Sequence, residues 1–384
     1  MRCAKFVLNT MVKNESHCII RMLSSVAPYI DYWVIQDNGS TDGTQDMIRS
    51  FFAERKIPGQ LYEIEWSGIP GKNRDHALQT CRGIDHGCDW ILRVDSDETI
   101  QVDSAFDWSV FDDLNAMSFN VLAQQGNCKY YRTWIWNAKL SWHFKHDKRH
   151  ECIYLEDLGE EFERRPLNES YRHMVFGDGK TWSDPYKFMI DALELERDLL
   201  IKDQLHLDRY HLMYLAKSYR DYCCDWRSKF PLGDPYRMEA ARRGLFLFER
   251  LMHIHHGYPE SKPTHIDENC YMVMIFCGEL YEALKDEESA LRCYLQADPF
   301  CPERNEHLVA AARIYRSRSL RLASQNTLQS RAEAELFRSR MALVMSPERR
   351  NPFPRFVVFL DTNCYYDSSD QPSKLYAEAV AMSS

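Results

Sequence analysis

Apolar and polar positions follow two different patterns in the first half of the chain. Short apolar runs alternate with segments in which apolar residues recur three or four positions apart. Buried strands produce the first pattern and amphipathic helices the second. Strands that alternate with helices form a parallel sheet with helices on both faces. We therefore predict an α/β domain over residues 1–183. Its predicted strands are Lys5–Val12, Tyr32–Asp37, Leu61–Trp66 and Trp90–Asp95, and its predicted helices include Cys18–Val26, Met47–Phe52 and Asp75–Gly83.

From residue 184 to 345 the strand pattern disappears and helical spacing takes over, which predicts an all-α domain. Spacings typical of a tetratricopeptide repeat, a pair of antiparallel helices, occur in it. The fullest copy is Met274, Cys277, Gly278 and Tyr281 followed by Ala290, Tyr294, Ala297 and Pro302, with partial copies at Leu308–Tyr315 and Leu212–Tyr219. An ordinary antiparallel bundle is the alternative. Residues 346–384 are rich in Pro, Asn, Ser and Asp, and we expect them to form a C-terminal tail.

Composition narrows the classes of function. The chain has 384 residues, a net charge of −9 and 45% hydrophobic residues, which is an ordinary globular balance. An acidic balance argues against binding to nucleic acid, which depends on Lys and Arg neutralising phosphates. No apolar run approaches the length of about 20 residues that a membrane span needs, and no signal sequence is recognisable. The 13 scattered cysteines are typical of a reduced, cytoplasmic protein.

A pair of carboxylates carries the clearest chemistry. Asp95 and Asp97 come directly after the apolar run that starts at Trp90. At the end of a strand, both side chains are able to face the same crevice. A hard divalent cation, Mg²⁺ or Mn²⁺, prefers such oxygen ligands and leaves positions open for phosphate oxygens. An exposed acidic turn would show the same sequence.

Two more loops follow predicted strands. In the first, Asp37 ends a strand and precedes a glycine-containing turn, where its carboxylate is placed to accept hydrogen bonds from a nucleobase or a ribose. A plain turn capped by Thr44 is the alternative. The second loop, Lys13-Asn14-Glu15, follows the first strand and is another candidate for binding a ligand. A capped helix start would show the same sequence.

A fourth loop brings two cations, Lys72 and Arg74, to the start of the helix predicted over Asp75–Gly83. Cations there add to the field of the helix N-terminus and favour a diphosphate. A solvated basic turn is the alternative.

In their order along the chain, from Lys13-Asn14-Glu15 through Asp37 and Lys72–Arg74 to Asp95 and Asp97, the four loops resemble the family 2 glycosyltransferases of GT-A fold, whose Rossmann-like domain binds nucleotide sugars. The combination with tetratricopeptide-like helices resembles a subgroup from bacteria and large viruses. The resemblance implies donor-nucleotide contacts from Asn14, Glu15, Asp37, Lys72, Arg74 and Asp95, and a metal held by Asp95 and Asp97. Arg74 matches the Arg of an Arg-Asn pair in the family, but this chain has Asp75 in place of the Asn.

The acceptor half rests on the same resemblance. His150-Glu151 is similar to a His-Glu pair of this subgroup, so Glu151 is assigned as the catalytic base, with Glu156 and Asp157 as alternatives. His173 falls where related enzymes place a metal ligand, although a core histidine would fit the position as well. Trp134, Trp136, Trp142 and Tyr130 would suit either a sugar site or a core.

These features predict a Mn²⁺- or Mg²⁺-dependent enzyme that moves a sugar from a UDP- or GDP-linked donor to a hydroxyl of a glycan or another acceptor. The resemblance favours inversion at the sugar. We expect the helical domain to hold the acceptor or to pair two chains as a homodimer. The alternative is an inactive scaffold of this fold. A nucleotidyltransferase would need a glycine-rich loop after the first strand. A glycosidase would leave the nucleotide loops unexplained.

Overall fold

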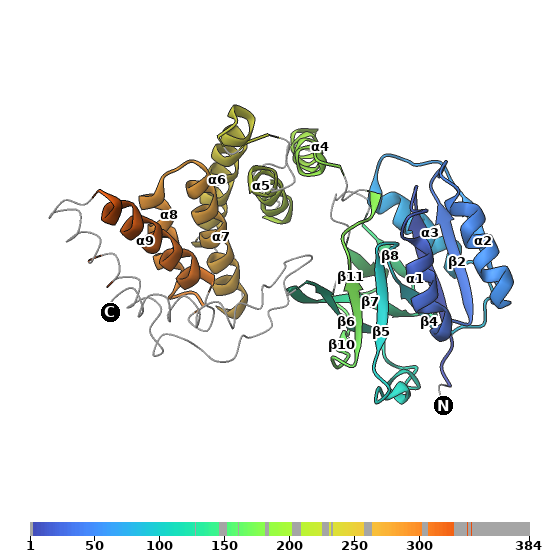
Figure 1. The fold of residues 1–384 in the computed structure, drawn as a ribbon. Coiled ribbons are helices and arrows are strands. Elements are labelled where there is room, and N and C mark those ends of the chain that lie inside the picture. Colours follow the sequence, from blue (N-terminus) through green and yellow to red (C-terminus); the bar gives the residue numbers. More distant parts are fainter. Residues whose placement is uncertain are drawn as a thin grey trace. The chain divides into compact units, whose positions relative to one another are not determined.

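The computed structural model describes residues 3–126, 128–145, 152–159, 161–180, 184–201, 209–224, 230–231, 233–256, 263–301 and 306–325, together with residues 336 and 339. The chain divides into two compact units, both drawn in Figure 1. Among the described residues, the first unit runs to Asp184 and the second begins at Pro185. The first unit is α/β and the second is helical, as the sequence predicts.

A mixed sheet forms the centre of the first unit. Its main path runs β3-β2-β1-β4-β7-β6-β11-β5, and β10 pairs with β6. The four strands β3, β2, β1 and β4 are parallel, whereas β7 runs antiparallel to β4 and to β6. A separate antiparallel pair consists of β8 and β9. The strands are β1 (Phe6–Val12), β2 (Tyr32–Asp37), β3 (Gly59–Glu63), β4 (Trp90–Arg93), β5 (Glu98–Val102), β6 (Ser118–Gln125), β7 (Cys128–Asn137), β8 (Trp142–Phe144), β9 (Ile153–Leu155), β10 (Arg165–Pro166) and β11 (Tyr171–Val175).

Both faces of β1, β2 and β4 are buried, whereas the edge strand β3 has no buried residue. Alternate residues of a strand point to opposite faces, so Phe6 and Leu8 join one core while Val7 joins the other. The first core includes side chains of α1 (Ile19–Val26) and α2 (Thr44–Arg55), and the second includes those of α3 (Pro70–Arg82) and of β8. Two short 3-10 helices, η1 (Ala27–Tyr29) and η2 (Trp108–Phe111), complete the unit. Burial on both faces explains why β1, β2 and β4 read as continuous apolar runs.

Several predicted elements have different bounds in the structure, and the strand predicted over Trp90–Asp95, for example, is β4, which ends at Arg93. The strand predicted over Leu61–Trp66 is β3, which begins at Gly59 and ends at Glu63. The helix predicted from Asp75 begins at Pro70, so Lys72 and Arg74 lie inside its first turns rather than before them. Proline suits the first position of a helix because its missing N–H has no partner there in any case. The Asn73 side chain reinforces this start by donating a hydrogen bond to the carbonyl oxygen of Ile69, at 2.8 Å.

The second unit consists of helices that contact their neighbours in chain order, from α4 to α9. Gly278 on α7 lies so close to α8 that a Cβ atom there would be 2.3 Å from the buried ring of Tyr294. Ala290, Tyr294 and Ala297 of the proposed repeat are all buried on α8, while Pro302 lies outside the described residues. The tetratricopeptide assignment itself stays a prediction. The helices are α4 (Lys187–Ile201), α5 (Arg209–Cys224), α6 (Pro235–His256), α7 (Pro263–Ala283), α8 (Glu287–Ala297) and α9 (Glu306–Ser324).

None of the helices in the described part of the chain combines the length and the apolar character that a membrane crossing requires.

Candidate functional site

The loops singled out by the sequence meet at one edge of the sheet. Strand β1 lies between β2 and β4, and all three run in the same direction, so their carboxyl ends are neighbours. The register pairs Val12 with Asp37 at the ends of β1 and β2. The loops after β1, β2 and β4 therefore leave the sheet side by side, which is where open α/β sheets bind ligands.

Asp37 has one carboxylate oxygen committed to its own loop and one without a partner. Oδ1 accepts hydrogen bonds from the backbone N–H groups of Gly39 and Ser40, at 3.0 and 2.8 Å, and from the Gln45 side chain at 2.7 Å. The side chain is fully buried, yet Oδ2 has no hydrogen-bond partner. A buried oxygen without a partner is costly unless a ligand supplies a donor. This arrangement fits recognition of a nucleobase N–H or a ribose hydroxyl.

Asn14 and Asp42 tie the first two loops together. Asn14 adopts a left-handed conformation with φ of 58°, and its side-chain oxygen accepts a hydrogen bond from the Thr41 N–H at 2.8 Å. Asp42 accepts hydrogen bonds from the Thr44 side chain at 2.6 Å and from the Ser16 N–H at 3.0 Å. Burial alone would raise the pKa of Asp42, but these hydrogen bonds outweigh it and lower that pKa to about 2. Asn14 thus has a loop-building contact, in addition to any donor contact.

Asp95 is engaged by arginines. Arg74 of α3 donates a hydrogen bond to its Oδ1 at 3.1 Å, and Arg93 lies 3.4 Å from both oxygens. Burial opposes ionisation of Asp95, but the charges of Arg74, Arg93 and Arg132 prevail and hold its pKa well below the usual range. The expected pair of open carboxylates is therefore unequal, because the charge of Asp95 is already compensated. Lys72 is exposed.

Asp97 is the uncompensated member of the pair. Only 8% of the residue is exposed, and its Oδ2 has no hydrogen-bond partner. Burial, followed by the charges of Glu98 and Asp95, raises the pKa of Asp97 to about 7. A buried carboxyl that is crowded by other acids fits a divalent cation, whose charge would relieve the repulsion. Mg²⁺ sites commonly use one or two carboxylates together with substrate phosphates, so Asp97 satisfies the minimum for such a site.

Glu15 is a second buried acid beside Asp97. Its carboxylate accepts a hydrogen bond from the Cys18 thiol at 3.2 Å and lies 3.3 Å from the backbone nitrogen of Lys180. Burial raises the pKa of Glu15, and its charge contributes to the raised pKa of Asp97. The sequence associates Glu15 with the donor nucleotide, and the structure brings it to the same cluster of acids as Asp97.

His173 lies on β11 with its ring fully enclosed. Its Nδ1 is 3.5 Å from Glu98, which is itself bound by two hydrogen bonds from Arg132, at 2.8 and 3.1 Å. Burial lowers the pKa of His173 and keeps the ring neutral. Among the described residues, the group of three metal-ligand side chains whose atoms lie within 4.8 Å of one another is Glu15, His17 and Cys18, not Asp95, Asp97 and His173. Metal ligation by His173 stays a prediction.

The acceptor side is less complete. The assigned base Glu151 and its neighbour His150 lie outside the described residues, and the alternatives Glu156 and Asp157 are exposed. The aromatic residues of this region are buried in the core rather than open to a sugar; they are Tyr130, Trp134, Trp136 and Trp142. Trp134 also packs beneath the guanidinium groups of Arg93 and Arg132, at 4.5 and 3.4 Å from its ring centre.

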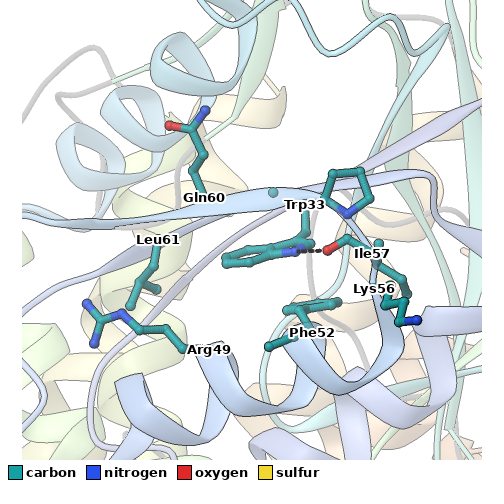
Figure 2. Close-up of a pocket in the computed structure, with 10 residues that line it drawn as sticks. Trp33, Arg49, Phe52, Lys56, Ile57, Gln60 and Leu61 are labelled. Atoms are coloured by element: carbon teal, nitrogen blue, oxygen red, sulfur yellow. Dashed lines mark hydrogen bonds between the residues drawn. The ribbon is translucent and has the colours of Figure 1, made fainter.

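An open pocket of 540 Å³ lies elsewhere, between α2 and the first residues of β2 and β3 (Figure 2). Its floor includes Trp33, whose ring stacks on Phe52 at 4.4 Å and donates a hydrogen bond to the Ile57 carbonyl. The pocket contains none of the predicted site residues and adjoins the amino ends of the strands. We therefore place the candidate site at the carboxylates and not at this pocket.

The comparison with protein families agrees with this location. Residues 10–105, a quarter of the chain, match the family model for Glycosyl transferase family 2. The matched range contains the loops after β1, β2 and β4 and the start of α3. It supports a glycosyltransferase. No curated protein matches the chain.

Four site residues are absent from the sequence-based set. Arg93 and Arg132 reach the acids through the pairing of β4 with β7 and of β7 with β6, which a single sequence does not reveal. Gly179 lies against the Asp97 side chain and Asp178 pairs with Arg21 of α1, but both are about 80 positions after Asp97, too far along the chain for a local pattern to connect them.

Proposed function

We propose that the first unit is a metal-dependent glycosyltransferase that moves a sugar from a nucleoside diphosphate donor to an acceptor hydroxyl. The observation that carries the proposal is the buried, uncompensated carboxyl of Asp97, at the same sheet edge as the unpartnered oxygen of Asp37. These two groups suit opposite ends of one ligand, a cation-bound diphosphate and a nucleoside. The family match over residues 10–105 supports the same class.

Each residue has a defined task in this proposal. Asp37 accepts a hydrogen bond from the base or the ribose, while Arg74 keeps Asp95 ionised next to the nucleotide. Asp97 holds Mn²⁺ or Mg²⁺, which, when bound, neutralises the charge that grows on the leaving diphosphate. Glu151 remains the proposed base that takes the proton of the acceptor hydroxyl as it attacks the sugar with inversion.

The helical unit is proposed to hold the acceptor or to pair two copies of the chain, because stacked helical repeats build extended binding surfaces.

One observation favours the second candidate, an inactive scaffold. Asp95 is compensated by Arg74 and Arg93, which weakens a cation site that needs both acids of the pair. The two candidates differ in one measurable property, because a scaffold would not cleave nucleotide sugars.

The test is a screen of UDP-, GDP- and dTDP-linked sugars for hydrolysis that depends on Mn²⁺ or Mg²⁺. We expect turnover with one class of donor and none after Asp97→Ala. Glu151→Ala should retain donor binding while transfer falls at least about a hundredfold, the usual size of a general-base contribution. Normal transfer by Glu151→Ala would refute the base assignment. Absence of metal-dependent turnover with every donor would favour the scaffold.

A further inference from the structure

The segment Phe176–Lys180, which follows β11, contacts both buried acids of the site. The N–H of Phe176 donates a hydrogen bond to the backbone carbonyl of Asp97 at 3.0 Å. The N–H of Lys180 points at the Glu15 carboxylate, 3.3 Å from each of its oxygens. Gly179, immediately before it, lies against the side chain of Asp97. Consecutive residues of one segment thus contact the two carboxylates.

Gly179 permits this close approach. A Cβ atom at this position would lie 3.2 Å from Cγ of Asp97 and 3.3 Å from its Oδ2, the oxygen that has no hydrogen-bond partner. Contacts that short force the carboxyl to move by a few tenths of an ångström. Gly177, by contrast, has φ of 64°, a left-handed conformation that favours glycine whatever surrounds it. The requirement at Gly179 is therefore one of space beside Asp97.

An ion pair fastens the segment to α1. Arg21 donates two hydrogen bonds to the Asp178 carboxylate, at 2.8 and 2.6 Å, and its guanidinium lies 3.9 Å from the ring centre of Phe176. The backbone carbonyl of Asp178 lies 2.7 Å from Nε2 of His17. Since α1 follows directly on the Glu15 loop, these contacts fix the segment relative to Glu15 as well as to Asp97.

We propose that the segment Phe176–Lys180 positions the Asp97 and Glu15 carboxylates to bind a divalent cation. Gly179 and the Arg21–Asp178 pair are its positioning residues. The inference rests on the proposed function, because the cation matters through the diphosphate it binds. Sites of this kind depend on sub-ångström placement of their ligands, so a small displacement of Asp97 weakens binding while leaving the fold intact.

Binding of Mn²⁺, alone and with UDP or GDP, tests the proposal in the full chain. Free Mn²⁺ is followed by electron paramagnetic resonance and nucleotide binding by calorimetry, with thermal unfolding as the check on folding. The variants are Gly179→Ala, Asp178→Asn, Arg21→Gln and the exchange Arg21→Asp with Asp178→Arg.

Two variants serve as controls. Asp103→Asn breaks the Arg172–Asp103 pair at the other end of β11, where the acidic partner is as exposed as Asp178. Gly83→Ala introduces the same methyl group at the end of α3, where its nearest neighbour would lie at an ordinary 3.4 Å.

We expect Gly179→Ala to weaken Mn²⁺-dependent binding at least about tenfold, because misplacement of a positioned group by about an ångström costs up to a hundredfold. The single charge variants should lose about two- to fivefold, as expected for an exposed ion pair. The exchanged pair should recover most of that loss, and both controls should bind normally.

Normal binding by Gly179→Ala, or an exchanged pair as weak as the single variants, would overturn the proposal. If Gly179→Ala unfolds, the exchanged pair decides alone. Wild-type protein without Mn²⁺-dependent binding would overturn the proposed function and this inference together, whereas normal wild-type binding with unaffected variants overturns this inference alone.

Discussion

Replacement of Asp97 by Asn should stabilise the first unit while removing its proposed cation ligand. The pKa of Asp97 is raised from 3.8 to about 7, a difference of about three units at about 1.4 kcal/mol each. Between pH 3.8 and 7 the unfolded chain is ionised at this residue while the folded chain keeps its proton. The wild type therefore loses stability as the pH rises through this window, and the full penalty of about 4 kcal/mol applies above pH 7. Asn is neutral throughout and escapes the penalty.

Urea unfolding at pH 5 and pH 8, in the presence of a chelator, measures this effect. Tryptophan fluorescence reports mainly on the first unit, because seven of the nine tryptophans precede residue 181. The advantage of Asp97→Asn over the wild type should grow by about 2–3 kcal/mol from pH 5 to pH 8. Asp85→Asn, at an exposed position, is the matched control and should show no such growth. Saturating Mn²⁺ should stabilise the wild type and leave Asp97→Asn unchanged.

An Asp97→Asn protein that is no more stable than the wild type at pH 8, or whose advantage does not change with pH, would refute this reasoning. Either result would mean that the carboxyl is solvated or already neutralised in the folded protein.

Three further variants test separate parts of the structure. Asp37→Asn keeps an oxygen that accepts the hydrogen bonds of the loop but replaces the unpartnered acceptor Oδ2 by an N–H donor. Nucleotide affinity, measured by calorimetry, should therefore fall about tenfold or more, while the melting temperature should not change. Asp42→Ala removes the carboxylate that joins the first two loops and should cost about 1 kcal/mol in urea at neutral pH, after allowance for its exposure. Because its folded-state pKa is lowered to about 2, that cost should shrink as the pH falls from 4 toward 2, and a cost independent of pH would contradict the assignment. Gly278→Ala would place a methyl group 2.3 Å from the buried Tyr294 ring. It should destabilise the helical unit by about 1–3 kcal/mol, as measured by urea unfolding followed with far-ultraviolet circular dichroism. Unchanged stability would mean that α7 and α8 do not approach so closely.

Most of the parallel half of the sheet was predictable, because β1, β2 and β4 are buried on both faces. Continuous apolar runs marked β1, β2 and β4, and their polar ends marked Asp37, Asp95 and Asp97. The antiparallel half was not predicted strand by strand, since its register depends on pairings such as Leu92 with Ile135 that no local pattern encodes.

The candidate site shows the same division. The sequence predicted a cation site on Asp95 and Asp97 together, but the electrostatics of the two acids differ because Arg74 and Arg93 pair with Asp95. Arg74 was expected to serve a diphosphate, and its observed partner is a carboxylate. Such distinctions arise from long-range packing, as does the approach of Gly179 to Asp97, and a single sequence does not contain them in readable form.

The central claim is that the carboxylates at this sheet edge bind a diphosphate through a divalent cation. Calorimetry tests it most directly, by titrating UDP and GDP into the wild type and into Asp97→Asn, each with Mn²⁺ and again with a chelator. We predict that one of the nucleotides binds the wild type much more tightly when Mn²⁺ is present, and that Asp97→Asn shows the weaker, metal-independent binding under both conditions. Equal affinity of the wild type with and without the metal, or a metal effect that survives in Asp97→Asn, would contradict it.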